Sequence, residues 1–182
     1  MNPMTHQLNA EEFGQRYAGE HVELLDGKVE DVPMPGTEHG TICIKVAIRL
    51  GGFIEQHALG VVASHDTFVR VGRDPDRVRG ADLAFWSRAR HPSGVVPLGL
   101  LDIPPDLVVE VRSPTDRWKQ VIAKVNEYLG VGVAGVVVLD PATGTISVFR
   151  PDAMPQTFAN GDTFTLPDVL PGFAVPVSAF FA

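Results

Sequence analysis

The sequence is short of cysteine and of long apolar runs, and each shortage excludes a class of protein. Its single cysteine, Cys43, rules out a disulfide bond within the chain. No stretch approaches the roughly 18 to 20 apolar residues that a membrane span needs. The segment Met1–His6 also lacks a basic stretch followed by an apolar one, the pattern of a secretion signal. We therefore expect a cytoplasmic protein that has no contact with a membrane.

Basic residues are also scarce. The 15 Lys and Arg residues against 22 Asp and Glu residues give a formal net charge of −7. This balance counts against nucleic-acid binding through a broadly basic surface, because phosphate neutralisation needs clustered cations. A local basic patch stays possible, and an ordinary solvated loop explains the same residues equally well. The arginines that cluster on both sides of Asp82 are Arg70, Arg73, Arg77, Arg79, Arg88 and Arg90.

Several catalytic motifs are missing as well. The sequence holds no P-loop, no H-E-x-x-H, no paired C-x-x-C and no G-x-S-x-G. Residues Gly130–Gly135 do match G-x-G-x-x-G, but a helix is predicted to enter this loop and a strand to leave it, the reverse of a dinucleotide-binding loop. We interpret it as a helix end and a turn. Cys43 lies among Ile42, Ile44 and Val46, where a small buried hydrophobic residue without a chemical role is expected.

The length and hydrophobic content favour one folded unit. With 182 residues, 45% of them hydrophobic, the chain can bury one substantial core, and we expect a single domain over residues 1–182. Apolar spacing and turn residues predict helices and strands in the order of a mixed α/β protein. The predicted elements are a helix at 10–18, a hairpin at 22–30 turning at Asp26-Gly27, a helix from Gly36 to about His57, and strands at 60–71, 79–86 and 106–112.

A second long helix is predicted to follow these strands. Ser113 is a natural N-cap, Pro114 suits the first helical position, and Gly130 can end the helix in a left-handed conformation. A buried strand at 136–139 and a hairpin into 145–150 come next, before a proline-rich tail with one or two short strands. The predicted apolar stripe of the helix consists of Trp118, Val121, Ile122, Val125 and Leu129.

Two carboxylates stand out because they fall inside apolar strands. Asp82 lies in the run 81–86 and Glu110 in the run 107–111. A lone ionised carboxylate in such a place costs several kcal/mol, so each needs a cation or a set of hydrogen-bond donors. A buried ion pair with Arg79 or Arg112 is one way to meet this need, and a shared metal ion is the other. The order of the strands suggests that the two carboxylates are neighbours, which favours the metal.

Two cations could serve the same site. Because side chains alternate along a strand, Glu110 shares a face with Val108 and Arg112. Lys124 lies at the edge of the apolar stripe of the second helix, where a long side chain reaches either solvent or a cleft. Position alone favours an exposed lysine.

Sequence pieces along nearly the whole chain, taken in their order and spacing, resemble the Uma2 family, also called DUF820, of restriction-endonuclease-like proteins. The resemblance implies a PD-(D/E)XK nuclease core, in which a mixed central sheet is flanked by helices, here with hairpins near both termini. In such a core an Asp and a Glu from adjacent strands bind Mg²⁺ and a lysine assists. The matching pieces are residues 23–28, 39–40, 78–85, 105–116, 124–129 with 132–133, 139–141 and 169–173.

Carried over to this sequence, the resemblance assigns the Asp to Asp82, the Glu to Glu110 and the lysine to Lys124, displaced from the strand to the following helix. The chain departs from the family pattern at Ala81, where a proline is usual. It departs again at the lysine position of the strand, which holds Arg112, a residue that cannot give up a proton. The resemblance also offers Glu23 and His39 as auxiliary groups. For Glu23, an exposed hairpin acid is an equal alternative.

These assignments predict a metal-dependent endonuclease that hydrolyses DNA. Mg²⁺ or Mn²⁺ would bind Asp82, Glu110 and the backbone carbonyl of Val111, because hard cations prefer oxygen ligands. Homodimerisation follows only by analogy with nucleases that cut both strands. A binding or interaction module that keeps the fold without catalysis is the main alternative, and the acidic net charge favours it. Hydrolysis of another phosphate ester is a third option.

Overall fold

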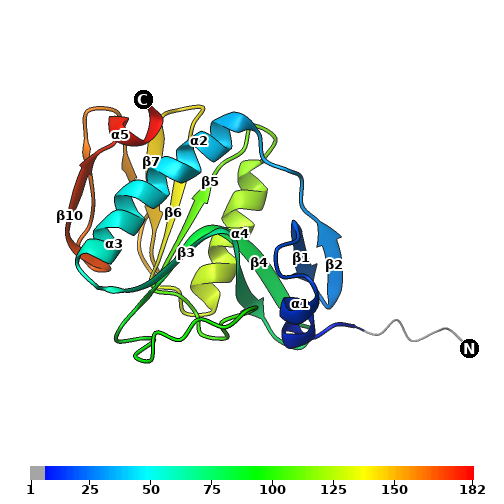
Figure 1. Cartoon of the computed structure of the whole chain (residues 1–182). Helices are drawn as coiled ribbons and strands as arrows, with labels where there is room; N and C mark the ends of the chain where they lie inside the picture. Colours follow the sequence, from blue (N-terminus) through cyan, green and yellow to red (C-terminus); the bar gives the residue numbers. More distant parts are fainter. Residues whose placement is uncertain (1–6) are drawn as a thin grey trace, which may run out of the picture.

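A mixed, mostly antiparallel sheet occupies the centre of the molecule (Figure 1). The computed structural model describes residues 7–182, so the segment considered above as a targeting signal lies outside the described residues. The strand order is β2-β1-β4-β5-β6-β7-β8, with β3 paired to β4, and β5 and β6 run parallel. The strands are β1 Val22–Leu25, β2 Lys28–Asp31, β3 Gly60–Gly72, β4 Arg77–Ser87, β5 Leu107–Val111, β6 Gly135–Asp140, β7 Thr145–Phe149 and β8 Gln156–Phe158.

Helices cover both faces of this sheet. The α2 helix Thr37–Val46, the π-helical turn η1 Ala47–Gly51 and the α3 helix Gly52–Gln56 pack on one face, together with a small sheet of β9 Thr163–Leu166 and β10 Leu170–Pro176 and the short α5 helix Ser178–Phe181. The α4 helix Trp118–Gly130 packs on the other face. Within residues 7–182, no helix is long and apolar enough to cross a membrane.

The N-terminal predictions are confirmed. The α1 helix Ala10–Arg16 begins with a capping box, in which Asn9 accepts a hydrogen bond from the backbone N–H of Glu12 at 2.8 Å. The β1–β2 hairpin turns at Asp26 and Gly27, which both have positive φ angles, of 53° and 76°. Such angles are those of the tight turn that Asp-Gly favours.

The first long helix continues through Gly51-Gly52, a pair of low helix propensity. Ile42, Val46 and Leu50 recur at helical spacing and are all buried. After the wide turn η1, Ile54 occupies the core and Phe53 packs at its margin. A π-helical turn rotates the residues that follow it, and the sequence pattern does not reveal such a turn.

The predicted start of the second long helix was wrong. The α4 helix begins at Trp118, after Arg117 as N-cap. The segment from Ser113 to Asp116 forms a turn of its own, in which the Ser113 N–H donates to Asp116 Oδ2 at 2.8 Å and the Asp116 N–H donates to the Ser113 carbonyl at 3.0 Å. As a result Trp118 lies 40% exposed, over the guanidinium of Arg112, and Tyr128 takes the buried place instead.

The sheet divides along β4, and this division creates the site. One edge of β4 pairs with β3 along nearly its whole length. On the other edge, Val78 pairs with Leu24 of β1, whereas Leu83 pairs with Val109 of β5. Asp82 therefore lies at the fork where β1 diverges and β5 joins. Side chains from β1, β4 and β5 can meet at this point.

Candidate active site

Asp82 and Glu110 are brought together at the fork. Leu83 of β4 pairs with Val109 of β5 in antiparallel register. The same register places the next residues, Asp82 and Glu110, opposite each other. Both line a cleft of about 120 Å³. The titratable residues that line this cleft include five carboxylates and a single lysine, so the space is acidic. They are His21, Glu23, His39, Asp66, Asp82, Glu110, Asp116 and Lys124.

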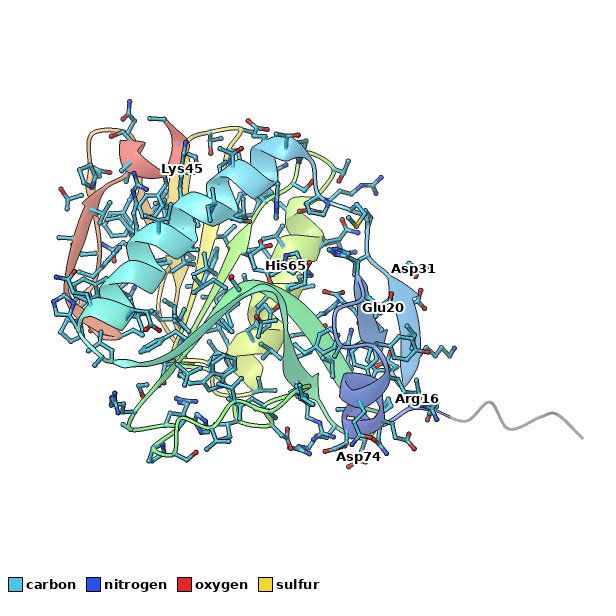
Figure 2. All side chains as sticks on the ribbon, in the orientation of Figure 1. Arg16, Glu20, Asp31, Lys45, His65 and Asp74 are labelled. Atoms are coloured by element: carbon cyan, nitrogen blue, oxygen red, sulfur yellow. The ribbon has the colours of Figure 1, made fainter. Side chains whose placement is uncertain are left out.

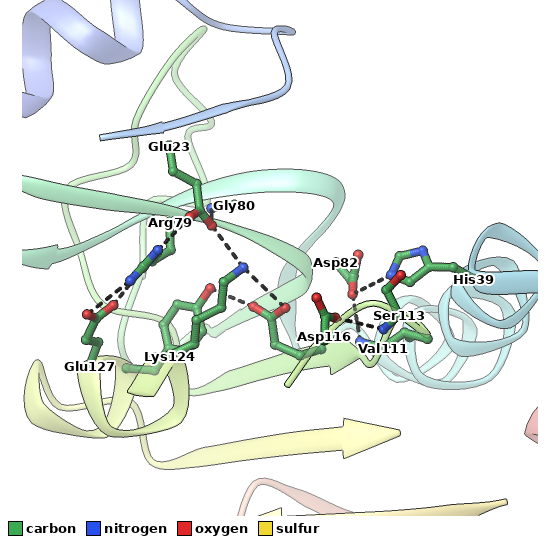
Figure 3. A network of polar contacts seen from close by, with 12 residues as sticks. Glu23, His39, Arg79, Gly80, Asp82, Val111, Ser113, Asp116, Lys124 and Glu127 are labelled. Carbon is green, nitrogen blue, oxygen red and sulfur yellow. Dashed lines mark hydrogen bonds and ion pairs between the residues drawn. The ribbon is translucent and has the colours of Figure 1, made fainter. Parts of the chain in front are cut away.

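Asp82 is bound from two sides. Its Oδ2 atom accepts a hydrogen bond from the backbone N–H of Val111 at 2.7 Å, and it lies 3.3 Å from His39 Nε2 (Figure 3). The hydrogen bond to Asp82, the negative charge of Asp82 and a hydrogen bond to the Val111 main chain together raise the pKa of His39 above its ordinary value, against the opposite effect of burial. His39 therefore favours the imidazolium form while it contacts Asp82.

Glu110 is also largely buried, and it lies near two other carboxylates. Its side chain is 13% exposed, and Oε1 accepts a hydrogen bond from the Tyr128 hydroxyl at 2.7 Å. Burial, together with the negative charges of Asp82 and Glu23, raises the pKa of Glu110 to about 7, although Lys124 and Tyr128 act in the opposite direction. Near neutral pH the carboxyl is therefore poised between its protonated and ionised forms.

Lys124 joins the carboxylates of β1 and β5 (Figure 3). Its Nζ atom lies 2.9 Å from Glu23 Oε1 and 3.9 Å from Glu110 Oε2. Although burial disfavours the charged form, the negative charges of Glu110 and Glu23 raise the pKa of Lys124 above its ordinary value. Lys124 is therefore a permanent cation in the cleft, and not the exposed lysine that its position in the helix favoured.

Glu23 is the centre of this network. Its side chain is only 8% exposed, so the alternative of an exposed hairpin acid was wrong. Burial alone would raise its pKa, but the positive charges of Lys124 and Arg79 outweigh burial and lower it. Arg79 Nη1 lies 2.6 Å from Glu23 Oε2, and Arg79 Nε lies 2.6 Å from Glu127. Glu23 therefore holds Lys124 in place while Glu127 holds Arg79.

The ion pairs considered above as an alternative to a metal do not form among the described residues. Arg79 pairs with Glu23 and Glu127, as described. Arg112 pairs with Asp140 at 3.0 Å and donates to the Asp116 carbonyl, and it is not among the residues that line the acidic cleft. The negative charges of Asp82 and Glu110 are therefore balanced by His39, Lys124 and hydrogen bonds.

The arginines around Asp82 do not form an open basic patch, although Arg73 and Arg88 are exposed as expected for a solvated loop. Arg70 is buried and contacts Glu11, Asp76 and Asp102. Besides Arg79, three further arginines of the group are paired with carboxylates, and Arg88 donates to a backbone carbonyl. The three pairs are Arg73–Asp102, Arg77–Glu127 and Arg90–Asp106.

Sequence reasoning missed some residues of the cleft. Tyr128 lies four residues after Lys124, hence on the same side of α4, and its hydroxyl needed a partner once buried; this spacing could have identified it. His21 and Asp66, paired at 3.0 Å, come from the residue just before β1 and from a bulge in β3. No sequence signal that we recognise places this bulge against Asp82.

The donors at the fork fit a hard divalent cation. Asp82 and Glu110 offer carboxylate oxygens on adjacent strands. The Val111 backbone forms hydrogen bonds with both Asp82 and His39. Burial is the main reason that the pKa of Glu110 is raised, and the negative charges of Asp82 and Glu23 raise it further. A cation bound between the carboxylates would neutralise their negative charge, and oxygen donors are those that Mg²⁺ and Mn²⁺ prefer.

Comparison with known proteins agrees with the fold. No curated protein matches the chain. A solved structure from Anabaena variabilis ATCC 29413 is described as "a putative nuclease belonging to DUF820". Its sequence is 20% identical to this chain, and the two structures superpose with a TM-score of 0.80. The match covers 96% of this chain and 97% of the Anabaena chain. A family model described as "Uma2: Putative restriction endonuclease" matches residues 10–178. Since that match spans nearly the whole chain, the protein belongs to the Uma2 family.

Proposed function

We propose that the protein is a metal-dependent endonuclease that hydrolyses phosphodiester bonds of DNA. Asp82, Glu110 and the backbone carbonyl of Val111 would hold Mg²⁺ or Mn²⁺. The single observation that carries the proposal is the meeting of Asp82, Glu110 and Lys124 at one fork of the sheet, with Lys124 Nζ 3.9 Å from Glu110. When bound, the metal would supply a water of lowered pKa and polarise the scissile phosphate.

Lys124 is proposed to stabilise negative charge. Its raised pKa keeps it protonated, so it cannot act as a general base near neutral pH. A fixed ammonium group beside the metal carboxylates would hold a phosphate oxygen and favour the charge that builds up on it during displacement. Arg112 is bound to Asp140, which favours Lys124 over Arg112 in this role.

Glu23, His39 and Tyr128 are proposed to act through their neighbours. Glu23 fixes the Lys124 ammonium at 2.9 Å, and Tyr128 fixes one oxygen of Glu110 at 2.7 Å. His39 holds one oxygen of Asp82. Each contact restricts the rotation of a group that must meet metal or phosphate, and such restriction is a large part of how enzymes lower barriers.

Cleavage of supercoiled plasmid DNA in the presence of Mg²⁺ tests the proposal. The wild-type protein should nick or linearise the plasmid, and Asp82→Ala and Glu110→Ala should not. Full Mg²⁺-dependent cleavage by either variant would overturn the site assignment. Parallel assays with nucleotides and simple phosphate esters would reveal a hydrolase of another substrate class.

An interaction module that keeps this fold without catalysis is the second candidate. The observation in its favour is the internal neutralisation of Arg70, Arg73, Arg77, Arg79 and Arg90, which leaves little positive charge next to an acidic cleft. Calorimetric titration with Mn²⁺ separates the two candidates. Absence of binding at millimolar Mn²⁺ would favour the module.

A further inference from the structure

A second set of metal-ligand atoms lies on the α2 side of Asp82. The Cys43 Sγ atom is 3.4 Å from His39 Nδ1 and 4.0 Å from His39 Nε2, and His39 Nε2 is 3.3 Å from Asp82 Oδ2. One ligand atom from each of the three residues can be chosen so that all lie within 4.8 Å of one another. The set combines a thiol, an imidazole and a carboxylate, and so differs in chemistry from the oxygen donors between Asp82 and Glu110.

The backbone holds these three residues in place. His39 and Cys43 are four residues apart on α2, so both project from one side of the helix. Asp82 projects from β4, the strand with β3 on one edge and β5 on the other. The ligands therefore come from two packed elements and not from a mobile loop. Such an origin favours a metal site of defined geometry.

The spacing suits tetrahedral coordination. A zinc ion with bonds of about 2.0 Å to nitrogen and oxygen and about 2.3 Å to sulfur holds its ligand atoms roughly 3.3 to 3.6 Å apart. The separation of His39 Nε2 from Asp82 Oδ2 lies within this range, and that from Cys43 Sγ exceeds it by a few tenths of an ångström. A small rotation of the Cys43 side chain would close the difference.

The cluster opens onto a cavity of about 240 Å³, which leaves room for a water or a fourth ligand. His21, His65 and Asp66 line the same cavity; His65 is labelled in Figure 2. His65 and Asp66 have positive φ angles of 72° and 52°, and they form the bulge of β3 between Ser64 and Thr67. Non-glycine residues in this conformation cost free energy and often occur at functional sites.

We propose that His39, Cys43 and Asp82 form a binding site for Zn²⁺ or a cation of similar preference for sulfur. Thiolate and imidazole ligands select such cations over Mg²⁺, which avoids sulfur. The Cys43 thiol and the His39 imidazolium would each release a proton to solvent as their sulfur and nitrogen atoms bond to the cation. Asp82 and Asp66 supply the negative charge that attracts the cation to the cavity.

A regulatory consequence follows, and this part rests on the proposed function. Asp82 belongs to both ligand sets, so Zn²⁺ bound to His39 and Cys43 would remove one carboxylate from the Mg²⁺ site. The two occupancies would compete, and Zn²⁺ would inhibit Mg²⁺-dependent cleavage. Inhibition by Zn²⁺ should be weaker in a Cys43→Ser variant, because oxygen replaces the sulfur ligand that Zn²⁺ prefers.

Titration of the reduced full-length protein with Co²⁺ alone tests the site, with Co²⁺ as a coloured substitute for Zn²⁺. One Co²⁺ per chain should produce a thiolate-to-metal charge-transfer band in the near ultraviolet. Because Cys43 is the single cysteine, the band can arise only from this residue. His39→Ala and Asp82→Asn should weaken Co²⁺ binding by roughly 10- to 100-fold or more. A wild-type protein that binds Co²⁺ without this band would overturn the proposal.

Matched controls separate this site from the proposed nuclease site. His57→Ala removes an exposed histidine at the end of the same helical region, and Glu110→Gln removes a carboxylate of the Mg²⁺ site only; both should keep the band. An unchanged Co²⁺ affinity in His39→Ala, read from the titration of the band, would also overturn the proposal. If a variant does not fold, alkylation of Cys43 in the wild-type protein decides: one equivalent of Zn²⁺ should protect the thiol, and unchanged alkylation would contradict the site. None of these readouts requires DNA cleavage, so failure of the proposed function leaves them informative.

Discussion

The hydroxyl group of Tyr128 donates a hydrogen bond of 2.7 Å to Oε1 of Glu110, and the tyrosine ring is fully buried. This contact fixes one oxygen of the carboxylate from the α4 side of the sheet. The other oxygen lies 3.9 Å from Lys124 Nζ. Glu110 is thus held in an orientation set by two residues of one helix, four positions apart.

Tyr128→Phe should therefore weaken metal binding without removing a metal ligand. The hydrogen bond lowers the pKa of Glu110, so its loss should raise that pKa further and shift the pH dependence of Mn²⁺ affinity to higher pH. Calorimetric titration of Mn²⁺ at several pH values measures this shift. An unchanged pH profile would mean that Tyr128 only fills space. Tyr17→Phe, at the C-cap of α1 and outside the cleft, is the matched control.

The metal affinity of the wild-type protein should depend on pH. The pKa of Glu110 is raised to about 7 by burial and by the charges of Asp82 and Glu23, so a proton competes with the metal below that pH. Mn²⁺ affinity should fall about tenfold per pH unit from pH 7 towards pH 5, with a proton released on binding. Affinity that is constant from pH 8 to pH 5 would contradict this position of Glu110.

The raised pKa of Glu110 also affects the stability of the metal-free protein, which should rise as the pH falls. Because the pKa of Glu110 is higher in the folded state than its ordinary value of 4.5, protonation of this group favours folding. Its stabilising contribution is complete below pH 4.5 and is lost as the pH rises through about 7. Compared with the wild type, Glu110→Gln should therefore lose less stability between pH 5 and pH 8, as measured by urea unfolding without metal. An identical pH dependence would argue against a raised pKa.

Glu23 should matter for stability as well as for Lys124. Glu23→Ala leaves Lys124 without its nearest carboxylate and Arg79 with Glu127 alone, at an expected cost of about 3 kcal/mol in the free energy of unfolding. Glu30→Ala is the matched control, because Glu30 is the exposed partner of Glu23 across the same hairpin. Its effect should stay within about 0.5 kcal/mol. Equal costs for the two variants in urea unfolding would contradict the buried network.

Lys124 should affect cleavage more than metal binding. Lys124→Met should lower the rate of plasmid cleavage by about 100-fold or more, while Mn²⁺ affinity stays the same or increases because a nearby positive charge is removed. Lys119→Met, exposed on the same helix, is the control.

Arg112→Met should instead destabilise the protein, since it leaves the buried Asp140 without its cation. If Arg112→Met and not Lys124→Met abolishes cleavage of a folded protein, the assignment of the lysine role is wrong.

The sequence predicts the elements of this site better than their contacts. Asp82 and Glu110 could be placed on neighbouring strands, because apolar runs and turn residues mark those strands. The fork in β4 could not be foreseen: Ala81 packs with the α4 cluster and Leu83 with the α2 cluster, so side-chain alternation is interrupted at Asp82 itself. The interruption lies opposite the bulge of β3, and it is set by pairing between distant segments.

At the start of α4, tertiary contacts outweigh the local helix-start preference of the sequence. Ser113 and Asp116 look like a helix start, and they do close a turn, but α4 begins only at Trp118. Arg112 stacks on Trp118 and pairs with Asp140, contacts that favour an exposed indole at this position. Intrinsic helix signals are weak compared with such contacts, so the first turn was misplaced and Trp118 was wrongly assigned to the apolar stripe. Val121 and Val125 of that stripe are buried as predicted.

A crystal soaked in Mn²⁺ and measured for anomalous scattering is the most direct test of the central claim. We expect an anomalous peak between the carboxylates of Asp82 and Glu110, within coordination distance of both and of the Val111 carbonyl, and we expect its loss in a Glu110→Ala crystal. At millimolar Mn²⁺, a map without a peak at this position, or a peak that persists unchanged in Glu110→Ala, would contradict it.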